Sequence, residues 1–132
     1  MGHKYIRELR NGRKNERERI DKRWFGWMWE KIRYGFDSRD TWCMEESLSR
    51  VIYERLCMYN EVAGKFIDLE FHEFEIDGET WSEQKCINYI LDVLKRRLQW
   101  DKTFWDKGYD ELEAETQGAF RILSIVLPAL WW

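Results

Sequence analysis

Apolar and polar positions recur with a helical period over most of this 132-residue chain, and the pattern is strongest in residues 33–61. Apolar side chains there lie three and four positions apart, which predicts the buried face of a long amphipathic helix. This face consists of Leu48, Val51, Ile52, Leu56 and Tyr59. Asp37 and Asp40 precede it, where carboxylates can accept hydrogen bonds from the free N–H groups of a first turn. We expect the helix to run to about Glu61, to end near Gly64, and to organise the packing of the other segments.

A helical pattern also covers residues 4–33, but its two halves differ. The first half is charged and weakly periodic, so residues 1–22 are interpreted as a basic helical arm. Residues 24–29 are apolar nearly all round, which indicates a helix that is buried on two sides or that faces a partner. Trp24, Trp27 and Trp29 are therefore candidates for the core or for a subunit interface.

The only β signal follows Gly64. Ile67, Leu69 and Phe71 alternate with polar residues, which predicts a short strand. Residues 74–81 then have the pattern of a small hairpin with a type I′ turn at Asp77-Gly78.

Two further amphipathic helices are expected in the second half of the chain. Ser82 is a typical N-cap for one of them. The other begins near Asp110, and Pro128 kinks or stops its last turn. The fold predicted from these elements is mostly α, with three to four packed helices and a small β-hairpin insertion. We expect a single helical domain over residues 23–132, preceded by the arm at 1–22.

Charge is unevenly distributed along the chain. Residues 1–23 contain nine Lys and Arg against four Asp and Glu, whereas the remainder carries a net charge of −8. The basic segment is suited to nucleic acid or to the acidic body of a second subunit, although its alternating charges are also typical of a solvated helix.

The cysteines and the hydropathy of the chain indicate in which cellular compartment the protein is expected. The three cysteines form no C-x-x-C pair, which favours reduced thiols in a cytoplasm. The apolar tail at 122–132 is too short to cross a bilayer, so no membrane association is predicted. No catalytic motif, cofactor site or paired Cys/His metal site is visible, and the sequence therefore favours a protein that is not an enzyme.

The loop before the central helix is the first candidate site. Asp37, Arg39, Asp40 and Trp42 place two carboxylates beside a guanidinium and an indole, a set that can recognise a cationic or nucleotide-like ligand. The same residues can instead form a helix cap and a charge-paired Arg that fix the angle between two helices.

An acidic cluster forms the second candidate site. It consists of Glu70, His72, Glu73 and Glu75, within a run at 61–83 that has eight Asp and Glu and only Lys65 opposing them. Such a run can compete for a basic groove on another protein, or it can be an ordinary solvated surface. One His among loosely spaced carboxylates is a weak metal-binding signal, and we expect no metal.

The loop at residues 35–42 has the sequence Gly-Phe-Asp-Ser-Arg-Asp-Thr-Trp and leads into a helix with Arg55 and Leu56 near its end. This stretch resembles a family of small tailed-bacteriophage proteins. The family pattern is a G-F-[SD]-[DS]-R-D-T-W loop that leads into a long helix. The resemblance covers roughly residues 29–98, including Trp81-Ser82-Glu83 at the start of a later helix, and departs from the pattern at residues 43–46. It implies a phage gene that acts in a host cell and carries over no catalytic residues.

Three functions follow as expectations. The leading one is a non-catalytic phage accessory protein that binds a host protein in the host cytoplasm, as a counter-defence inhibitor that acts by occlusion. The second is a binder that sequesters a nucleotide signal in a pocket lined by Trp and Arg. The third is a nucleic-acid-associated protein that uses residues 1–23. A homo-oligomer that pairs through the tryptophans at 24–29 is compatible with each of them.

Overall fold

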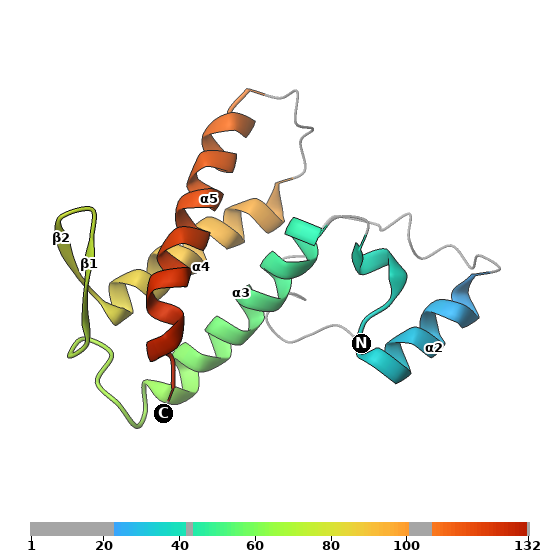
Figure 1. Cartoon of the computed structure of the whole chain (residues 1–132), viewed down its shortest axis with the longest axis horizontal. Coiled ribbons are helices and arrows are strands. Elements are labelled where there is room, and N and C mark those ends of the chain that lie inside the picture. The colour runs from blue at the N-terminus through green and yellow to red at the C-terminus, as the bar shows by residue number, and fades with distance from the viewer. Residues whose placement is uncertain (1–22, 42–43, 101–106, 132) are drawn as a thin grey trace.

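A computed structural model describes residues 23–41, 44–100 and 107–131 of the chain (Figure 1). The predicted arm at 1–22, Trp42 and Cys43 lie outside these residues. The fold is mostly helical with one small antiparallel hairpin, as the sequence predicts. The described α-helices are α2 (Trp24–Tyr34), α3 (Met44–Ala63), α4 (Glu83–Gln99) and α5 (Tyr109–Val126). The shorter elements are the 3-10 helices η3 (Ser38–Thr41) and η4 (Leu127–Ala129) and the strands β1 (Glu73–Ile76) and β2 (Glu79–Ser82).

Helix α4 lies at the centre of the core, because it packs against α3 on one side and α5 on another. Its apolar face is fully buried at Cys86, Ile87, Ile90, Val93 and Leu94. The Ser82 hydroxyl accepts a hydrogen bond from the backbone N–H of Lys85 at 3.1 Å, which confirms the predicted N-cap.

Helix α3 buries a face that overlaps only in part with the one its sequence suggested, because Leu56 is buried and Ile52 packs against the core as expected. Leu48 and Val51 were expected in the core, but they are 47% and 38% exposed. The buried side chains of α3 are instead those of Ser49, Tyr53, Leu56 and Ala63. The apolar positions of α3 span more of its circumference than α4 covers, so part of the predicted face is left in solvent.

Polar contacts fix the end of α3 against the start of α4. The Tyr59 hydroxyl donates to the buried carboxylate of Glu83 at 2.9 Å, and Gln84 donates to the side chain of Asn60 at 2.9 Å. Burial, and then the neighbouring Glu83 carboxylate, raise the pKa of Tyr59 to about 12. The free thiols of Cys57 and Cys86 lie in or beside the core, and burial raises the pKa of both.

The hairpin forms with the predicted turn. Asp77 and Gly78 have φ values of 51° and 81°, as a type I′ turn requires, and the Arg121 guanidinium of α5 donates to both carboxylate oxygens of Asp77. The predicted strand at Ile67, Leu69 and Phe71 is absent, because this segment forms turns. The carbonyl groups of Leu69 and of the following His72 accept hydrogen bonds from the first N–H groups of α4, so they cap a helix instead of joining a sheet.

Helix α2 stands apart from this core, at the end of the molecule away from the hairpin (Figure 1). It contacts η3, and η3 contacts α3. None of the eleven residues of α2 is buried, so the expectation that residues 24–29 belong to the core is wrong.

Candidate functional site

The first candidate site is a corner formed by α2, the turn at Gly35 and η3. Gly35 ends α2 in the left-handed conformation, with φ at 83°, and reverses the chain toward η3. The backbone N–H of Asp37 then donates to the Asp40 carboxylate at 3.0 Å, while the N–H of Arg39 donates to the Asp37 carboxylate at 2.9 Å. These two carboxylates thus accept from two backbone N–H groups at η3, whereas the sequence predicted them as caps of the long helix, which begins only at Met44.

Asp37 is the buried charge of this corner, only 2% exposed. The Arg39 guanidinium donates to both of its oxygens, at 3.0 and 2.7 Å, and the Lys31 ammonium lies 3.6 Å away. Hydrogen bonding from Arg39 is the main cause that holds the pKa of Asp37 below its ordinary value. The Arg39 guanidinium also lies over the Trp27 ring, 4.4 Å from its centroid, so the cation has both a carboxylate and an aromatic partner.

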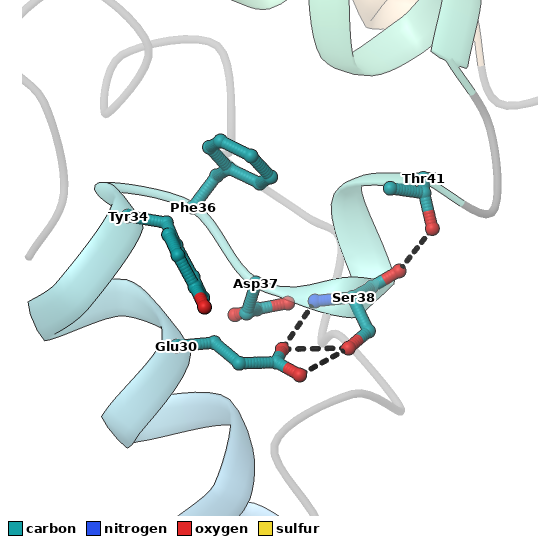
Figure 2. A pocket seen from close by; sticks show the side chains of 6 residues that line it. All are labelled: Glu30, Tyr34, Phe36, Asp37, Ser38 and Thr41. Carbon is teal, nitrogen blue, oxygen red and sulfur yellow. Dashed lines mark hydrogen bonds between the residues drawn. The ribbon is translucent and has the colours of Figure 1, made fainter.

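Glu30 of α2 forms the other link across the corner. Its carboxylate accepts hydrogen bonds from the backbone N–H and the hydroxyl of Ser38 at 2.6 Å, as Figure 2 shows. A depression of about 310 Å³ lies beside this link. It is lined by Glu30, Tyr34, Phe36, Asp37, Ser38 and Thr41.

The structure therefore brings Asp37, Arg39 and Asp40 together, but turns their polar groups toward one another. Trp42, the fourth predicted member, lies outside the described residues. Asp37 already takes the Nε and one Nη2 N–H of Arg39, and Trp27 lies against the face of the guanidinium, so only its remaining N–H groups are left for a ligand such as a nucleotide phosphate. The contacts fit the second of the two alternatives, a corner that sets the angle of α2, and no observation tests the first.

The acidic cluster is spread along a surface. Glu73 and Glu75 lie on the exposed side of β1, while Phe74 and Ile76 point to the other side. Glu70 and His72 precede β1, in the segment where a strand was predicted and turns are found.

His72 is exposed, and it contacts the buried Glu83 at the start of α4. Its carbonyl accepts from the N–H of Glu83 at 2.8 Å, and its Nδ1 lies 3.7 Å from the Glu83 carboxylate. Across the described ranges, no three side chains of His, Cys, Asp or Glu are grouped closely enough to hold a metal ion.

A third surface is formed by large apolar side chains on α2, which we call the α2 apolar face. It consists of Trp24, Phe25, Met28, Trp29 and Ile32. At 100° per residue these five positions span about 140° of the helix without a polar interruption. All five side chains are exposed, from 38% at Trp24 to 75% at Phe25.

The opposite side of α2 makes the contacts to the corner, through Trp27 and Glu30. Of the three tryptophans proposed for an interface, Trp24 and Trp29 therefore lie on the α2 apolar face and Trp27 does not. Phe25, Met28 and Ile32 were not proposed, although the spacing of four residues from Trp24 to Met28 to Ile32 indicates a common face.

Comparison of the chain with protein-family models, with curated proteins and with solved structures gave no match. Within the part of the chain that the structure describes, no helix combines the length and the apolarity needed to span a bilayer.

Proposed function

We propose that this chain is a non-catalytic protein-binding module that inserts the α2 apolar face into a hydrophobic groove on a partner protein. The observation that carries the proposal is the exposure of five large apolar side chains on one face of a helix that buries none of its residues. A short helix that presents residues at i, i+4 and i+8 has the form of a ligand for such a groove.

The size of the surface supports this function. The exposed parts of these five side chains amount to roughly 500 Å², near the upper end of the largest apolar patches that monomeric proteins expose. A standard interface buries about 800 Å² on each partner. The α2 apolar face is therefore large enough to form the centre of an interface, with charged residues of α2 such as Arg33 at its rim.

The corner supports the same function from the other side of the helix. The Asp37–Arg39 pair, the contact of Arg39 with Trp27 and the Glu30–Ser38 link hold α2 by the side that carries Trp27 and Glu30. A helix that is held in place before binding loses less conformational entropy when the complex forms.

The resemblance of residues 35–42 to the phage family suggests where the partner is found. We place the module in the cytoplasm of an infected cell and its partner among host proteins, where it acts as a counter-defence inhibitor by occlusion. The α2 apolar face takes the main role in this proposal, and the acidic surface at Glu73 and Glu75 a secondary one.

The test is affinity capture from host lysate with three tagged forms of the full chain. We expect the unaltered chain and the acidic-surface variant E73K/E75K to retain the same host protein, the variant with a modest loss because its surface has only a secondary role. We expect the variant F25D/I32D to lose it at least tenfold, because two carboxylates in the groove are costly to desolvate. All substituted side chains are exposed, so circular dichroism serves as a check that the fold is unchanged.

Two results would contradict the proposal. If E73K/E75K loses the captured protein and F25D/I32D retains it, binding is assigned to the acidic surface. The other result is that no protein is captured, that the chain sediments with anionic lipid vesicles, and that F25D/I32D abolishes this sedimentation. It assigns the α2 apolar face to a membrane surface instead.

A further inference from the structure

The depression at the corner is lined by aromatic rings and by carboxylates. The rings of Tyr34 and Phe36 lie with their centroids 6.3 Å apart and their planes inclined by 36°. The carboxylates are those of Glu30 and Asp37. Figure 2 shows the Tyr34 side chain extending from the end of α2 toward these carboxylates, with the Phe36 ring above it. A cation that enters the depression therefore meets aromatic rings and negative charge together.

The two carboxylates differ in how their charge is balanced. Asp37 is paired with the guanidinium of Arg39 and the ammonium group of Lys31. Glu30 accepts hydrogen bonds from Ser38, which is a neutral donor, and it forms no ion pair with a cation of the described residues. The charge of Glu30 is therefore left to act on a ligand in the depression.

Both rings are accessible from the depression. Tyr34 is 58% exposed and Phe36 is 54% exposed. The Arg33 guanidinium lies 5.5 Å from the centroid of the Tyr34 ring, but Arg33 does not line the depression. The surface that Tyr34 contributes to the depression is therefore open to a second cation.

We propose that this depression binds a quaternary ammonium group, which contacts the rings of Tyr34 and Phe36 and is held by the charge of Glu30. Such a group spreads its charge over methyl groups and is the cation that aromatic sites recognise in other proteins. It has no N–H donor, so it needs no hydrogen-bond acceptor in the site.

The absence of N–H donors is what separates this cation from a primary ammonium or guanidinium group. Each oxygen of Glu30 and of Asp37 already accepts a hydrogen bond, from Ser38 or from Arg39. A primary ammonium or guanidinium group brings several N–H donors into competition for these oxygens. A primary ammonium group is also strongly hydrated, so it loses more on leaving water.

The size of the depression fits a small group. Its volume of about 310 Å³ lies at the lower end of the range for small-molecule sites. Two kinds of molecule carry a quaternary ammonium group of this size: a free molecule of the choline type, and a trimethylated lysine side chain of a protein. The site recognises the chemistry that both share, and titration distinguishes the two sources.

An NMR titration of the full chain with tetramethylammonium chloride, at constant ionic strength, tests the site. We expect saturable shifts of the Tyr34 ring signals, with a dissociation constant of roughly 1–10 mM for a site with two rings. Phe36→Ala should weaken binding about threefold to tenfold. Glu30→Gln should weaken it by a similar factor, about threefold to tenfold, because glutamine keeps an acceptor for Ser38 and loses the charge. Phe71→Ala removes an exposed ring elsewhere and is the matched control.

Two further comparisons use ligands of known charge and origin. Choline should bind at least about fivefold more tightly than its neutral isostere 3,3-dimethylbutan-1-ol, because only choline carries the charge. Tighter binding of Nα-acetyl-trimethyllysine amide than of choline identifies a modified protein as the source of the group. The reverse order identifies a free small molecule, and either order supports the site.

Three results would overturn the proposal. One is the absence of a saturable shift up to about 100 mM tetramethylammonium. Another is equal affinity for choline and its neutral isostere, and the third is binding that neither Phe36→Ala nor Glu30→Gln weakens. F25D/I32D changes residues outside the depression and should bind tetramethylammonium like the unaltered chain. This proposal and the proposed host-protein binding can therefore fail separately.

Discussion

Helices α2 and α4 both present apolar side chains at helical spacing, yet α4 buries six residues and α2 buries none. The difference lies in what surrounds them. Helix α4 lies between α3 and α5, and its apolar side chains meet those of two neighbours. Helix α2 is held by its more polar side, through Trp27 and Glu30, and turns its more apolar side outward. Apolar composition alone therefore does not place a helix in a core; neighbours with matching faces do.

The comparison predicts that one substitution has two very different costs. Ile90 of α4 is 1% exposed and Ile32 of α2 is 74% exposed. We expect Ile90→Ala to lower the free energy of unfolding by about 3 kcal/mol, because it removes buried methyl groups and leaves a cavity. Ile32→Ala should change it by no more than about 0.5 kcal/mol. Chemical denaturation followed by far-UV circular dichroism measures both.

An equal cost at the two positions would contradict this distinction between the helices. It would mean that the α2 apolar face is already covered within one copy of the chain, which would also remove the basis of the proposed function.

The sequence predicted local features better than which helix faces are buried, for reasons visible in particular residues. The period of α4, the Ser82 cap and the Asp77-Gly78 turn are local signals, and the structure confirms each of them. Whether Leu48 or Ser49 is buried depends on where α4 lies against α3, which no local pattern encodes. The same is true of α2, because its apolar pattern fits a core helix and a partner-facing helix equally well.

The candidate corner was predicted in part. Asp37 and Asp40 were expected as caps of the long helix; their bonds to backbone N–H groups follow from the local spacing, but they belong to η3. The contact between Arg39 and Trp27 joins residues twelve positions apart on two elements, so it depends on how Gly35 reverses the chain.

A smaller contrast is expected between two hydroxyls that donate to carboxylates. Tyr59 donates to the buried Glu83 between α3 and α4, whereas Ser38 donates to Glu30 at the exposed corner. Tyr59→Phe should lower the free energy of unfolding by about 1–2 kcal/mol, because a buried carboxylate loses a hydrogen-bond donor. Ser38→Ala should lower it by less than about 0.5 kcal/mol, because water replaces the donor. Both values come from urea denaturation.

A pH series provides a second measurement of the same contact. The pKa of Tyr59 is raised from 10.0 to about 12, so the folded protein keeps a proton that the unfolded chain loses. This contribution to stability is complete below pH 10.0 and is lost as the pH rises toward about 12. Wild-type stability should therefore fall more steeply over this range than that of Tyr59→Phe. Parallel curves would show that the hydroxyl is not buried against Glu83.

At the corner, the expected effect is local instead of global. Asp37→Asn removes the charge that Arg39 and Lys31 share, which should weaken the attachment of α2 by about 1 kcal/mol while α3, α4 and α5 stay folded. Hydrogen exchange should become roughly fivefold faster in residues 24–41 and remain unchanged in residues 83–99. If hydrogen exchange accelerates equally in both segments, the corner unfolds together with the core and is part of the same cooperative unit.

The same carboxylate predicts an acid response. The pKa of Asp37 is lowered in the fold. Its contribution to the stability of the corner is therefore present at pH values above its ordinary pKa of about 3.9, and it is lost as the pH falls through the lowered pKa. The assigned indole NMR signal of Trp27, which lies beside Arg39, should shift over this acid range in the wild type and remain constant in Asp37→Asn.

The smallest expected contrast concerns two glycines with the same backbone strain in different places. Gly35 has φ at 83° and Gly78 has φ at 81°, and an added Cβ would meet no other atom within 4 Å at either position. Replacing either by Ala thus imposes only the left-handed backbone penalty of about 1 kcal/mol. Gly78 lies in the hairpin that contributes the buried Ile76 to the core, so Gly78→Ala should lower the global free energy of unfolding by that amount. Gly35→Ala should leave it unchanged and accelerate hydrogen exchange in residues 24–41, because its strain is confined to the connection of α2. If Gly35→Ala also lowers global stability, α2 folds together with the core, and its outward apolar face is held more firmly than the corner contacts alone explain.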